Sequence, residues 1–375
     1  MKFYKVGGAV RDHLMGLKHK QSDIDWVVVG GTEEELLNLG FTKINADFPV
    51  FLHPKTKEEY ALARKEHKAG RGYKGFKTDF SRNITLEDDL YRRDLTINAI
   101  AEDEDGKGYI DPYGGIDDIN NKILRHVSKY FKDDPLRLIR LARFYSNFKP
   151  LGFEVADETF TLLKEIIDSE ELAIIPRERI LLEIKKLDAK TNRYEFFSFI
   201  HSLGALSHIL PSFTKLLNDQ TDNLRYIDEM SDQDLPTDFL LISLIPIRKQ
   251  SFDSDKFKEF LEALKIDLPV SNKFKLAGQT LCSLAQACYE EISTQQLIKL
   301  FDQYSKSGRS EIFEAAFILI KQSNLGDRMI TKRIEFLGKL LTEVEKEFNK
   351  VDKSNLTPKE IISLKSQIAE NLLDK

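Results

Sequence analysis

One short segment constrains the fold of this chain more than any other. Residues 22–29 read Ser-Asp-Ile-Asp-Trp-Val-Val-Val, so two carboxylates, Asp23 and Asp25, are followed directly by bulky apolar residues. β-Branched residues favour strands, and side chains two positions apart in a strand project from the same face. The segment therefore predicts a strand that its apolar half fixes in a core, with Asp23 and Asp25 side by side at its start.

These paired carboxylates have an ordinary and a chemical interpretation. Surface strands often carry acidic residues, so a lone Asp-x-Asp is weak evidence for a metal site. Two ionised carboxylates held side by side repel each other, however, and a divalent cation beside them relieves the repulsion. A third carboxylate, Glu59, opens a strand pattern at residues 59–64. We expect Asp23 and Asp25 to bind Mg²⁺ and Glu59 to complete a catalytic set, in which two metal ions about 4 Å apart promote in-line attack on phosphorus.

A glycine turn stands just upstream of these carboxylates. Residues 5–12 read Lys-Val-Gly-Gly-Ala-Val-Arg-Asp, which is a short apolar run, a double glycine and the start of a helix. Glycine lets a backbone approach a ligand closely, and a guanidinium group binds phosphate oxygens well. We expect Gly8 and Arg11 to bind a nucleotide triphosphate, although an isolated arginine on a helix is more often simply solvated.

The chain changes character near residue 126. Before this point strand and helix patterns alternate, and one helix starts at Thr32, with Glu35 completing a capping box. After it, apolar residues recur at spacings of three and four to the end. The pattern predicts an α+β fold, a mixed sheet with helices packed on it followed by an all-helical remainder. Glycines at 70–75 predict a flexible loop, and Pro211 predicts a break between helices.

Composition narrows the class of protein. A length of 375 residues allows two or three domains, and no apolar run approaches the roughly 18 residues that a membrane span needs. A strand pattern begins at the N-terminus, and the two cysteines lack the spacing of a redox pair or zinc site, so we expect a cytoplasmic protein without a signal peptide or membrane partner. The net charge of −5 hides six basic residues against one acidic residue at 64–77, which favours a phosphate-bearing partner.

A second polar cluster lies at residues 90–99, which read Leu-Tyr-Arg-Arg-Asp-Leu-Thr-Ile-Asn-Ala. Taken alone, the cluster also fits a capped helix with solvated arginines. In the chemical interpretation, the arginine, aspartate and asparagine residues all belong to a nucleotide-binding site. Arg93 and Asn98 would contact the triphosphate and the sugar, and Asp94 would hold an arginine in place.

A third cluster occupies residues 133–144, Asp-Asp-Pro-Leu-Arg-Leu-Ile-Arg-Leu-Ala-Arg-Phe. We expect a helix over 134–148 with one slowly turning charged stripe, because the charged residues recur every three positions. The expected stripe consists of Asp134, Arg137, Arg140 and Arg143. Such stripes are usually solvated, but the apolar residues between these positions favour a helix packed on both sides, with the stripe lining a cleft. A carboxylate and a guanidinium group one turn apart can present an acceptor and donors to the Watson–Crick edge of a base.

Taken in this order and spacing, these segments resemble the motifs of the class II tRNA nucleotidyltransferases, the CCA-adding enzymes of the polymerase-β-like superfamily. The matching segments are Gly-Gly-Ala-Val-Arg-Asp at 7–12, Asp-Ile-Asp at 23–25, Arg-Arg-Asp-Leu-Thr-Ile-Asn-Ala at 92–99 and the run at 133–144. The resemblance covers residues 1–165 and implies four parts. These are a nucleotidyltransferase head at 1–125, a helical neck for base selection at 126–190, a helical body at 191–268 and a helical tail at 269–375.

The resemblance also implies an activity. It is the stepwise, template-independent addition of C, C and A to the 3′ end of tRNA, from CTP and ATP with Mg²⁺ and release of pyrophosphate. Asp23 and Asp25 match the family's metal ligands, and Glu59 is a looser match to its third carboxylate. The matching nucleotide-binding positions are Gly8, Arg11, Arg93, Asp134, Arg137, Arg140 and Arg143. Asp134 and Arg137 would read the base, while Asp133 stands where the family usually has Glu.

The rest of the resemblance concerns RNA. The helical second half would dock the acceptor stem and T-arm of tRNA by shape and backbone charge. The glycine-rich basic segment at 70–75 resembles the loop that complete CCA-adding members need for the switch to ATP. Longer members carry an HD phosphohydrolase domain, whose metal centre needs several histidines. All seven histidines here lie at or before His208, so we expect no HD domain and no metal-dependent phosphatase activity.

Three alternatives differ in activity. An A-adding or CC-adding specialist is the nearest, and the segment at 70–75 favours complete addition over it. Bacterial poly(A) polymerases share the head motifs but usually add basic terminal extensions, whereas this chain has six residues before its first glycine and mixed charge at 349–375. A non-catalytic RNA-binding protein is disfavoured by the intact carboxylates and arginines. The sequence leaves the oligomeric state and the preferred tRNAs open.

Overall fold

The structure of the chain is a computed structural model. It describes residues 1–17, 24–45, 49–70, 76–187, 193–217, 237–245, 247, 249, 252–304, 310–324, 326–352, 354 and 356–373. The predicted metal ligand Asp23 and the predicted loop beyond Gly70 lie outside the described residues. The chain divides into two compact units, the first formed by Met1–Lys186 and Phe199–Ile209 and the second by Leu187–Ser198 and Leu210–Lys375. The predicted domain limits at 125, 190 and 268 stay predictions.

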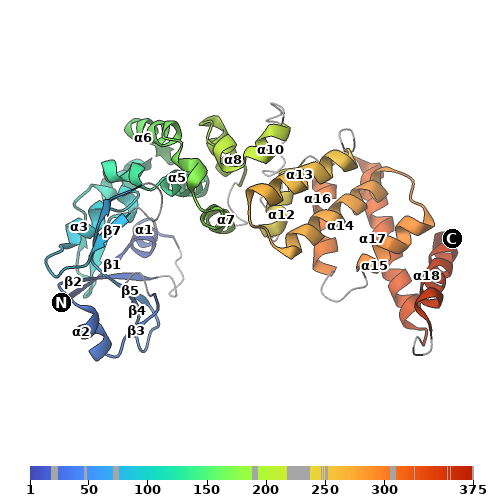
Figure 1. The fold of residues 1–375 in the computed structure, drawn as a ribbon, viewed down its shortest axis with the longest axis horizontal. Helices are drawn as coiled ribbons and strands as arrows, with labels where there is room; N and C mark the ends of the chain where they lie inside the picture. Colours follow the sequence, from blue (N-terminus) through green and yellow to red (C-terminus); the bar gives the residue numbers. More distant parts are fainter. Residues whose placement is uncertain are drawn as a thin grey trace. The chain divides into compact units, whose positions relative to one another are not determined.

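Among the described residues, the first unit is built on a mixed sheet of seven strands in the order β3-β4-β5-β2-β1-β8-β9 (Figure 1). At its centre, β2 (Asp25–Val29) pairs antiparallel with β1 (Lys2–Val6) and parallel with β5 (Glu59–Leu62). The other strands are β3 (Thr42–Lys43), β4 (Val50–Leu52), β8 (Ala101–Asp103) and β9 (Tyr109–Ile110). The predicted α+β fold, a mixed sheet followed by helices, is confirmed.

Alternation along β2 gives the sheet two apolar faces. Trp26 packs on one face with Tyr60, and their rings stack with centroids 5.2 Å apart. Val27 packs on the other face, with Leu90 of α3 (Leu86–Tyr91). Asp25 shares the face of Val27 because the two residues are two positions apart. The strand is thus held from both sides, with its carboxylate at the start, as the segment predicts.

The helix α2 (Glu33–Asn38) packs on the Trp26 face through the buried Leu36. Its predicted capping box is confirmed, since the Thr32 hydroxyl accepts a hydrogen bond from the Glu35 N–H and the Glu35 carboxylate accepts one from the Thr32 N–H. A separate antiparallel hairpin, β6 (Lys65–Lys68) with β7 (Phe76–Asp79), flanks the predicted loop. Sequence patterns give no strand here, because the segment is charged and lacks alternating apolar residues.

Three long helices of the first unit follow the sheet, namely α5 (Leu136–Phe148), α6 (Asp157–Asp168) and α7 (Arg177–Lys185). The start of α5 differs from the prediction. Asp134 lies before the helix with φ −112° and ψ 103°, and its Oδ1 accepts a hydrogen bond from the Leu136 N–H at 3.1 Å. Proline disfavours helical backbone in the residue before it, so Pro135 keeps Asp134 extended. The expected stripe is therefore three helical arginines, and its carboxylate, Asp134, is an extended residue between a 3₁₀ turn (Lys129–Asp133) and the helix.

Shorter elements complete the first unit. They are α1 (Gly8–Leu14), α4 (Gly115–Asn121), α9 (Leu206–Ile209), the pair β10 (Ile123–Leu124) and β11 (Glu154–Val155), and 3₁₀ turns at Thr96–Asn98, Lys129–Asp133, Lys149–Leu151 and Glu171–Ile174. The helix α8 (Arg193–Ser202) has residues in both units.

The described part of the second unit is helical. Its helices are α10 (Pro211–Leu217), α12 (Thr237–Ile242), α13 (Ser254–Asp267), α14 (Asn272–Tyr289), α15 (Thr294–Tyr304), α16 (Ser310–Ser323), α17 (Arg328–Asn349) and α18 (Pro358–Leu373). Pro211 marks a break between helices, as predicted: α9 ends at Ile209 and α10 begins at Pro211, because proline fits the first turn of a helix. The buried Asp267 accepts hydrogen bonds from the N–H groups of Ser212 and Phe213 at 3.2 and 2.9 Å. No helix in the described ranges has the length and apolarity to cross a membrane.

Candidate active site

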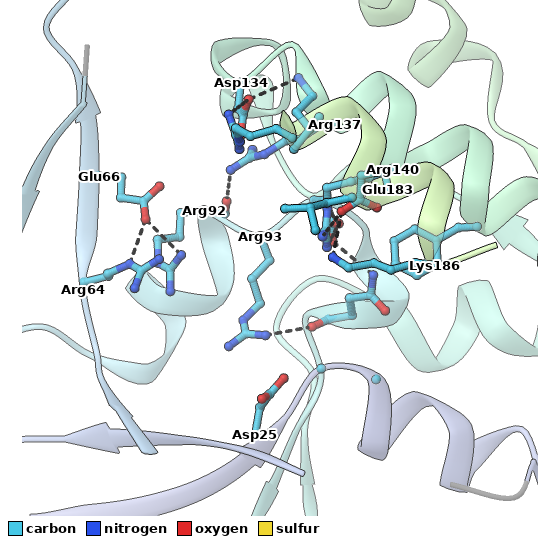
Figure 2. A pocket seen from close by; sticks show the side chains of 18 of the residues that line it. Asp25, Arg64, Glu66, Arg92, Arg93, Asp134, Arg137, Arg140, Glu183 and Lys186 are labelled. Carbon is cyan, nitrogen blue, oxygen red and sulfur yellow. Dashed lines mark hydrogen bonds and ion pairs between the residues drawn. The ribbon is translucent and has the colours of Figure 1, made fainter. Parts of the chain in front are cut away.

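A cavity of about 750 Å³ opens in the first unit (Figure 2). Eight cationic side chains and five carboxylates line it within the described part of the chain. The cationic residues are Arg11, Arg64, Arg92, Arg93, Arg137, Arg140, Arg179 and Lys186, and the carboxylates are Asp25, Glu66, Asp94, Asp134 and Glu183. An excess of positive charge in a concave site favours a polyanionic ligand.

The glycine turn forms part of the cavity wall. Gly7 has φ +74°, a conformation that glycine adopts without strain, and Gly8 begins α1. A Cβ atom at Gly7 would lie 3.4 Å from Arg93 Nη1 and 3.8 Å from Asp25 Oδ2. The turn therefore brings bare backbone next to a cation and a carboxylate that come from distant parts of the sequence.

The predicted carboxylates are only partly brought together. Asp25 is exposed and lines the cavity. Glu59 is its register partner on β5, but Glu59 does not line the cavity. No group of three or more His, Cys, Asp or Glu residues gathers within the described ranges, which leave out Asp23. Asp25 still offers the carboxylate oxygens that hard divalent cations prefer, at the place where the glycine turn meets Arg93.

Arg11 has several protein partners. Its Nη1 donates to Asn98 Oδ1 at 2.6 Å, and its Nε and Nη2 donate to Asp12 Oδ1 at 2.8 and 2.6 Å. The guanidinium carbon also lies 5.4 Å from the ring centroid of Phe144 and 5.0 Å from that of Phe148. Arg11 therefore connects α1 to Asn98 and to α5, and its predicted contact with a nucleotide stays a prediction.

Arg92 and Arg93 both line the cavity, and Arg93 extends toward Asp25 (Figure 2). The buried Asp89 accepts hydrogen bonds from Arg92 Nη2 at 2.6 Å and from Arg93 Nη2 at 3.2 Å. The Nε atom of Arg93 is buried and has no hydrogen-bond partner. An unpaired buried N–H is costly, and a phosphate oxygen would satisfy it.

The structure shows the predicted hold of Asp94 on an arginine. Asp94 is 7% exposed, and its Oδ2 accepts hydrogen bonds from Arg140 Nε and Nη2 at 2.8 and 2.6 Å. Its Oδ1 accepts one from Asn98 Nδ2 at 3.0 Å. Burial alone would raise the pKa of Asp94, but the charge of Arg140 and the Asn98 hydrogen bond hold it well below its ordinary value. Asp94 therefore stays ionised and joins the 92–98 segment to α5.

Replacing Asp94 by asparagine should destabilise the protein most at neutral pH. Because the native pKa of Asp94 lies below the unfolded value of about 4, its contribution is fully present above that value and is lost as the pH falls toward the native pKa. We expect Asp94→Asn to lower the free energy of unfolding by about 3 kcal/mol near neutral pH. Urea unfolding of both proteins over a pH series measures the difference, with the exposed Asp105→Asn as control. A difference that stays constant down to about pH 3 would contradict the assignment.

The predicted base-reading residues are each held by other groups. Asp134 Oδ1 and Oδ2 accept hydrogen bonds from Arg179 Nη1 and Nη2 at 3.3 and 2.9 Å. Arg137 donates to the carbonyl oxygens of Tyr130 at 2.8 Å and Arg92 at 2.5 Å. Both side chains line the cavity with their partners fixed, as Figure 2 shows for Asp134 and Arg137.

Of the other two predicted arginines of α5, Arg140 lies at the cavity and Arg143 does not. Arg140 lines the cavity and is held by Asp94. Arg143 does not line it, and its Nε donates to Glu183 Oε2 at 2.8 Å. Burial lowers the pKa of Arg143, and Glu183 offsets this only in part. Its predicted place beside the nucleotide is therefore not supported by the shape of the cavity.

Several cavity residues were not predicted. The charged ones are Glu66 of β6, Arg92, the α7 residues Arg179 and Glu183, and Lys186 directly after α7, whereas Arg64 belongs to the basic segment predicted at 64–77. In α7 a signal was available, because these charges are four and seven positions apart on a helix whose other face carries Ile180, Leu181 and Ile184. Charges at helical spacing opposite a buried apolar stripe indicate one exposed or cavity-facing surface.

Comparison with known proteins gives consistent results. Residues 3–125 match the family of the poly A polymerase head domain. A protein named CCA-adding enzyme from Pseudomonas putida is 42% identical over 327 residues, covering 87% of this chain and 85% of that protein. The solved Bacillus stearothermophilus CCA-adding enzyme in complex with CTP has a TM-score of 0.69 at 22% identity, covering 99% of this chain and 88% of that one. The Thermotoga maritima CCA-adding enzyme complexed with tRNA-CCA has a TM-score of 0.60 at 22% identity, covering 100% and 91%.

The head domain and its cavity define a nucleotidyltransferase. Sequence identity to the Pseudomonas putida protein extends over most of both chains, and the two structural likenesses show a shared fold. The chain belongs to the CCA-adding enzyme family. The resemblance to class II tRNA nucleotidyltransferases is thus confirmed, and this class of enzyme depends on a divalent metal.

Proposed function

We propose that the cavity holds CTP or ATP and that the protein adds C, C and A to the 3′ end of tRNA without a nucleic acid template, releasing pyrophosphate. One juxtaposition carries this proposal: Asp25 and Arg93 at the glycine turn line the same cavity as Asp134 and Arg137 of the predicted neck. The first pair suits a triphosphate and its metal, and the second suits a base. The CTP and tRNA complexes of the two related enzymes support these partners.

The triphosphate would lie against the arginine-rich wall beside the glycine turn. Arg93 faces this region with a buried Nε that lacks a partner, and Arg64 and Arg92 line the wall next to it. Guanidinium groups bind phosphate oxygens through paired, charge-assisted hydrogen bonds. Gly7 has no side chain between the backbone and this space, which leaves room for a phosphate.

The residues present fit a divalent cation. Asp25 offers carboxylate oxygens, the donors that Mg²⁺ prefers, and Asp23 two positions earlier would offer others. When bound there, Mg²⁺ would lower the pKa of the attacking 3′-hydroxyl group of the tRNA and neutralise charge on the triphosphate. We propose Asp23 and Asp25 as its ligands, and the predicted part of Glu59 stays a prediction.

Base selection would depend on which groups of the base donate hydrogen bonds and which accept them. C and A carry an amino group at the position where U and G carry a carbonyl oxygen. An ionised carboxylate only accepts and a guanidinium group only donates, so Asp134 would accept from the amino group while Arg137 donates to the neighbouring ring nitrogen. Arg179 and the two carbonyl oxygens hold this pair in place before a base arrives. Such preorganisation reduces the cost of ordering the site on binding.

The remaining predicted contacts belong to the same proposal. Gly8, Arg11, Asn98 and Arg140 line the cavity and would support the sugar and phosphates, directly or through Asp94. Both cysteines are unpaired thiols buried on α14, which suits the reducing cytoplasm that we propose as the compartment.

The proposal is tested by nucleotide incorporation on three tRNA substrates: one lacking all of CCA, one lacking the final A, and one complete. Each is incubated with CTP, ATP, UTP or GTP alone and with CTP and ATP together. If the enzyme adds complete CCA, the first tRNA should gain two C residues with CTP alone and C, C and A with CTP and ATP together. The second tRNA should gain one A with ATP, and the third should gain nothing. Repeated A addition to all three would instead show a poly(A) polymerase, and addition of only C or only A would show a specialist.

A further inference from the structure

A buried carboxylate lies behind the phosphate-binding wall without touching the cavity. Asp89 of α3 is 0% exposed and is not among the residues that line the cavity. Arg92 donates to its Oδ1 through Nε at 3.1 Å and Nη2 at 2.6 Å, and Arg93 donates to its Oδ2 at 3.2 Å. The backbone N–H of Arg64 donates to Oδ1 at 3.2 Å. One carboxylate thus contacts two guanidinium groups of the cationic wall and the backbone of a third arginine.

Asp89 and Glu66 together hold three guanidinium groups that would otherwise repel one another. Arg92 and Arg93 are neighbours in sequence, so their side chains leave the backbone in different directions and their charges repel. Glu66 joins the other side of the group, because Arg64 Nε and Arg92 Nη1 both donate to its Oε1, at 2.7 and 3.2 Å. Figure 2 shows Arg64 and Arg92 converging on Glu66 while Arg93 extends toward Asp25. Two carboxylates therefore hold three guanidinium groups in one wall with one net positive charge.

The charge state of Asp89 agrees with this role. Burial alone would raise the pKa of Asp89, but Arg92 and Arg93 outweigh it and hold the pKa below its ordinary value. The carboxylate stays ionised and can keep both arginines in place. Arg93 needs this hold most, because it has a weak contact to the Asn98 carbonyl at 3.5 Å and an unpaired buried Nε.

We infer that Asp89 is a positioning residue for nucleotide binding: it aims Arg93 at the triphosphate and keeps Arg92 and Arg64 in register beside it. The inference rests on the proposed role of Arg93 in holding the triphosphate. Asp89 itself touches no substrate. Its contribution is to fix, before the ligand arrives, side chains that would otherwise lose rotamer freedom on binding.

Inorganic tripolyphosphate is the probe, because it tests the phosphate wall without the base or the tRNA. Calorimetric titration of the whole 375-residue chain should show about tenfold weaker binding for Asp89→Asn and for Arg93→Ala, as expected for the loss of one charge-assisted contact. The loss in the double variant should be smaller than the two single losses combined, because much of the effect of Asp89 passes through Arg93. Wild-type affinity in Asp89→Asn, or additive losses in the double variant, would overturn the inference.

The neighbouring residue provides a matched control. Asp88 is also a carboxylate of α3, but it caps the helix at Thr85 and pairs with Lys65 at 3.0 Å, outside the cavity. Asp88→Asn should change thermal stability while leaving tripolyphosphate affinity within about twofold of wild type. A loss equal to that of Asp89→Asn would mean that both act only through the fold, which would also overturn the inference.

Two further outcomes separate the possible failures. If Arg93→Ala binds tripolyphosphate as the wild type does, the proposed role of Arg93 fails, and this inference fails with it. If Arg93→Ala weakens binding and Asp89→Asn does not, only this inference fails. Should Asp89→Asn not fold, as judged by circular dichroism, Asp89→Glu replaces it. The longer side chain keeps the charge but displaces both guanidinium groups, so wild-type affinity in Asp89→Glu would contradict a positioning role.

Discussion

Replacing Asp25 by asparagine should abolish nucleotide incorporation while leaving the fold intact. Asp25 is exposed at the cavity, so replacing it by an isosteric amide costs little stability. The replacement removes a negatively charged oxygen ligand of the divalent cation. We expect kcat/KM for C addition to fall by about three orders of magnitude or more. Single-turnover incorporation of CMP into tRNA lacking CCA measures the loss. The same loss is expected for Asp23→Asn if the two residues share the metal.

The control for this prediction is a carboxylate of the same domain outside the cavity. Asp105 is exposed and pairs with Lys107 at 3.0 Å, so Asp105→Asn should keep activity within about twofold of wild type. Excess Mg²⁺ or Mn²⁺ should not restore Asp25→Asn, since the ligand itself is missing. Incorporation at the wild-type rate in Asp25→Asn would remove Asp25 from the metal site.

Replacing Asp134 should change which bases are accepted. An asparagine there no longer presents two acceptor oxygens to an amino group, and it weakens the pairing with Arg179. We expect kcat/KM for CTP and ATP to fall by about 10- to 100-fold, the value of one lost charge-assisted hydrogen bond. The preference for CTP over UTP should shrink by a similar factor. Steady-state incorporation of each nucleotide alone gives both ratios.

Two companion variants sharpen this result. Arg137→Lys should also lose discrimination, because a lysine cannot contact the Tyr130 and Arg92 carbonyl oxygens and a base at once. Asp168→Asn, at the exposed end of α6, should leave the preference unchanged. An unaltered ratio of CTP to UTP in Asp134→Asn would place base selection elsewhere.

Much of the site was predictable because its residues sit in patterns that local geometry explains. Asp25 and Trp26 belong to one strand, which the run of bulky apolar residues at 26–29 predicts, and the structure places them as expected. The same holds for the Thr32 cap and for the long helices, whose apolar spacing is regular. Identity of the class came from the order of several such segments rather than from any single one.

The residues that were missed depend on contacts between distant segments. Glu66 is 26 positions from Arg92, and Arg179 is 45 positions from Asp134, so no local spacing in the sequence predicts either pair. Asp89 looks like any acidic residue in the first turn of a helix, and only its burial reveals its partners. The predicted start of α5 at residue 134 is wrong for a local reason. Pro135 keeps Asp134 out of the helix, although the helical pattern that follows would include it.

The most direct test of the proposed nucleotide site is an experimental structure with a non-hydrolysable CTP analogue and Mg²⁺. We expect the cytosine amino group to lie within hydrogen-bond distance of the Asp134 carboxylate, Arg93 to contact the triphosphate, and Asp25 and Asp23 to contact the metal. A base turned away from Asp134 and Arg137, or a triphosphate bound without Arg93, would contradict the proposal.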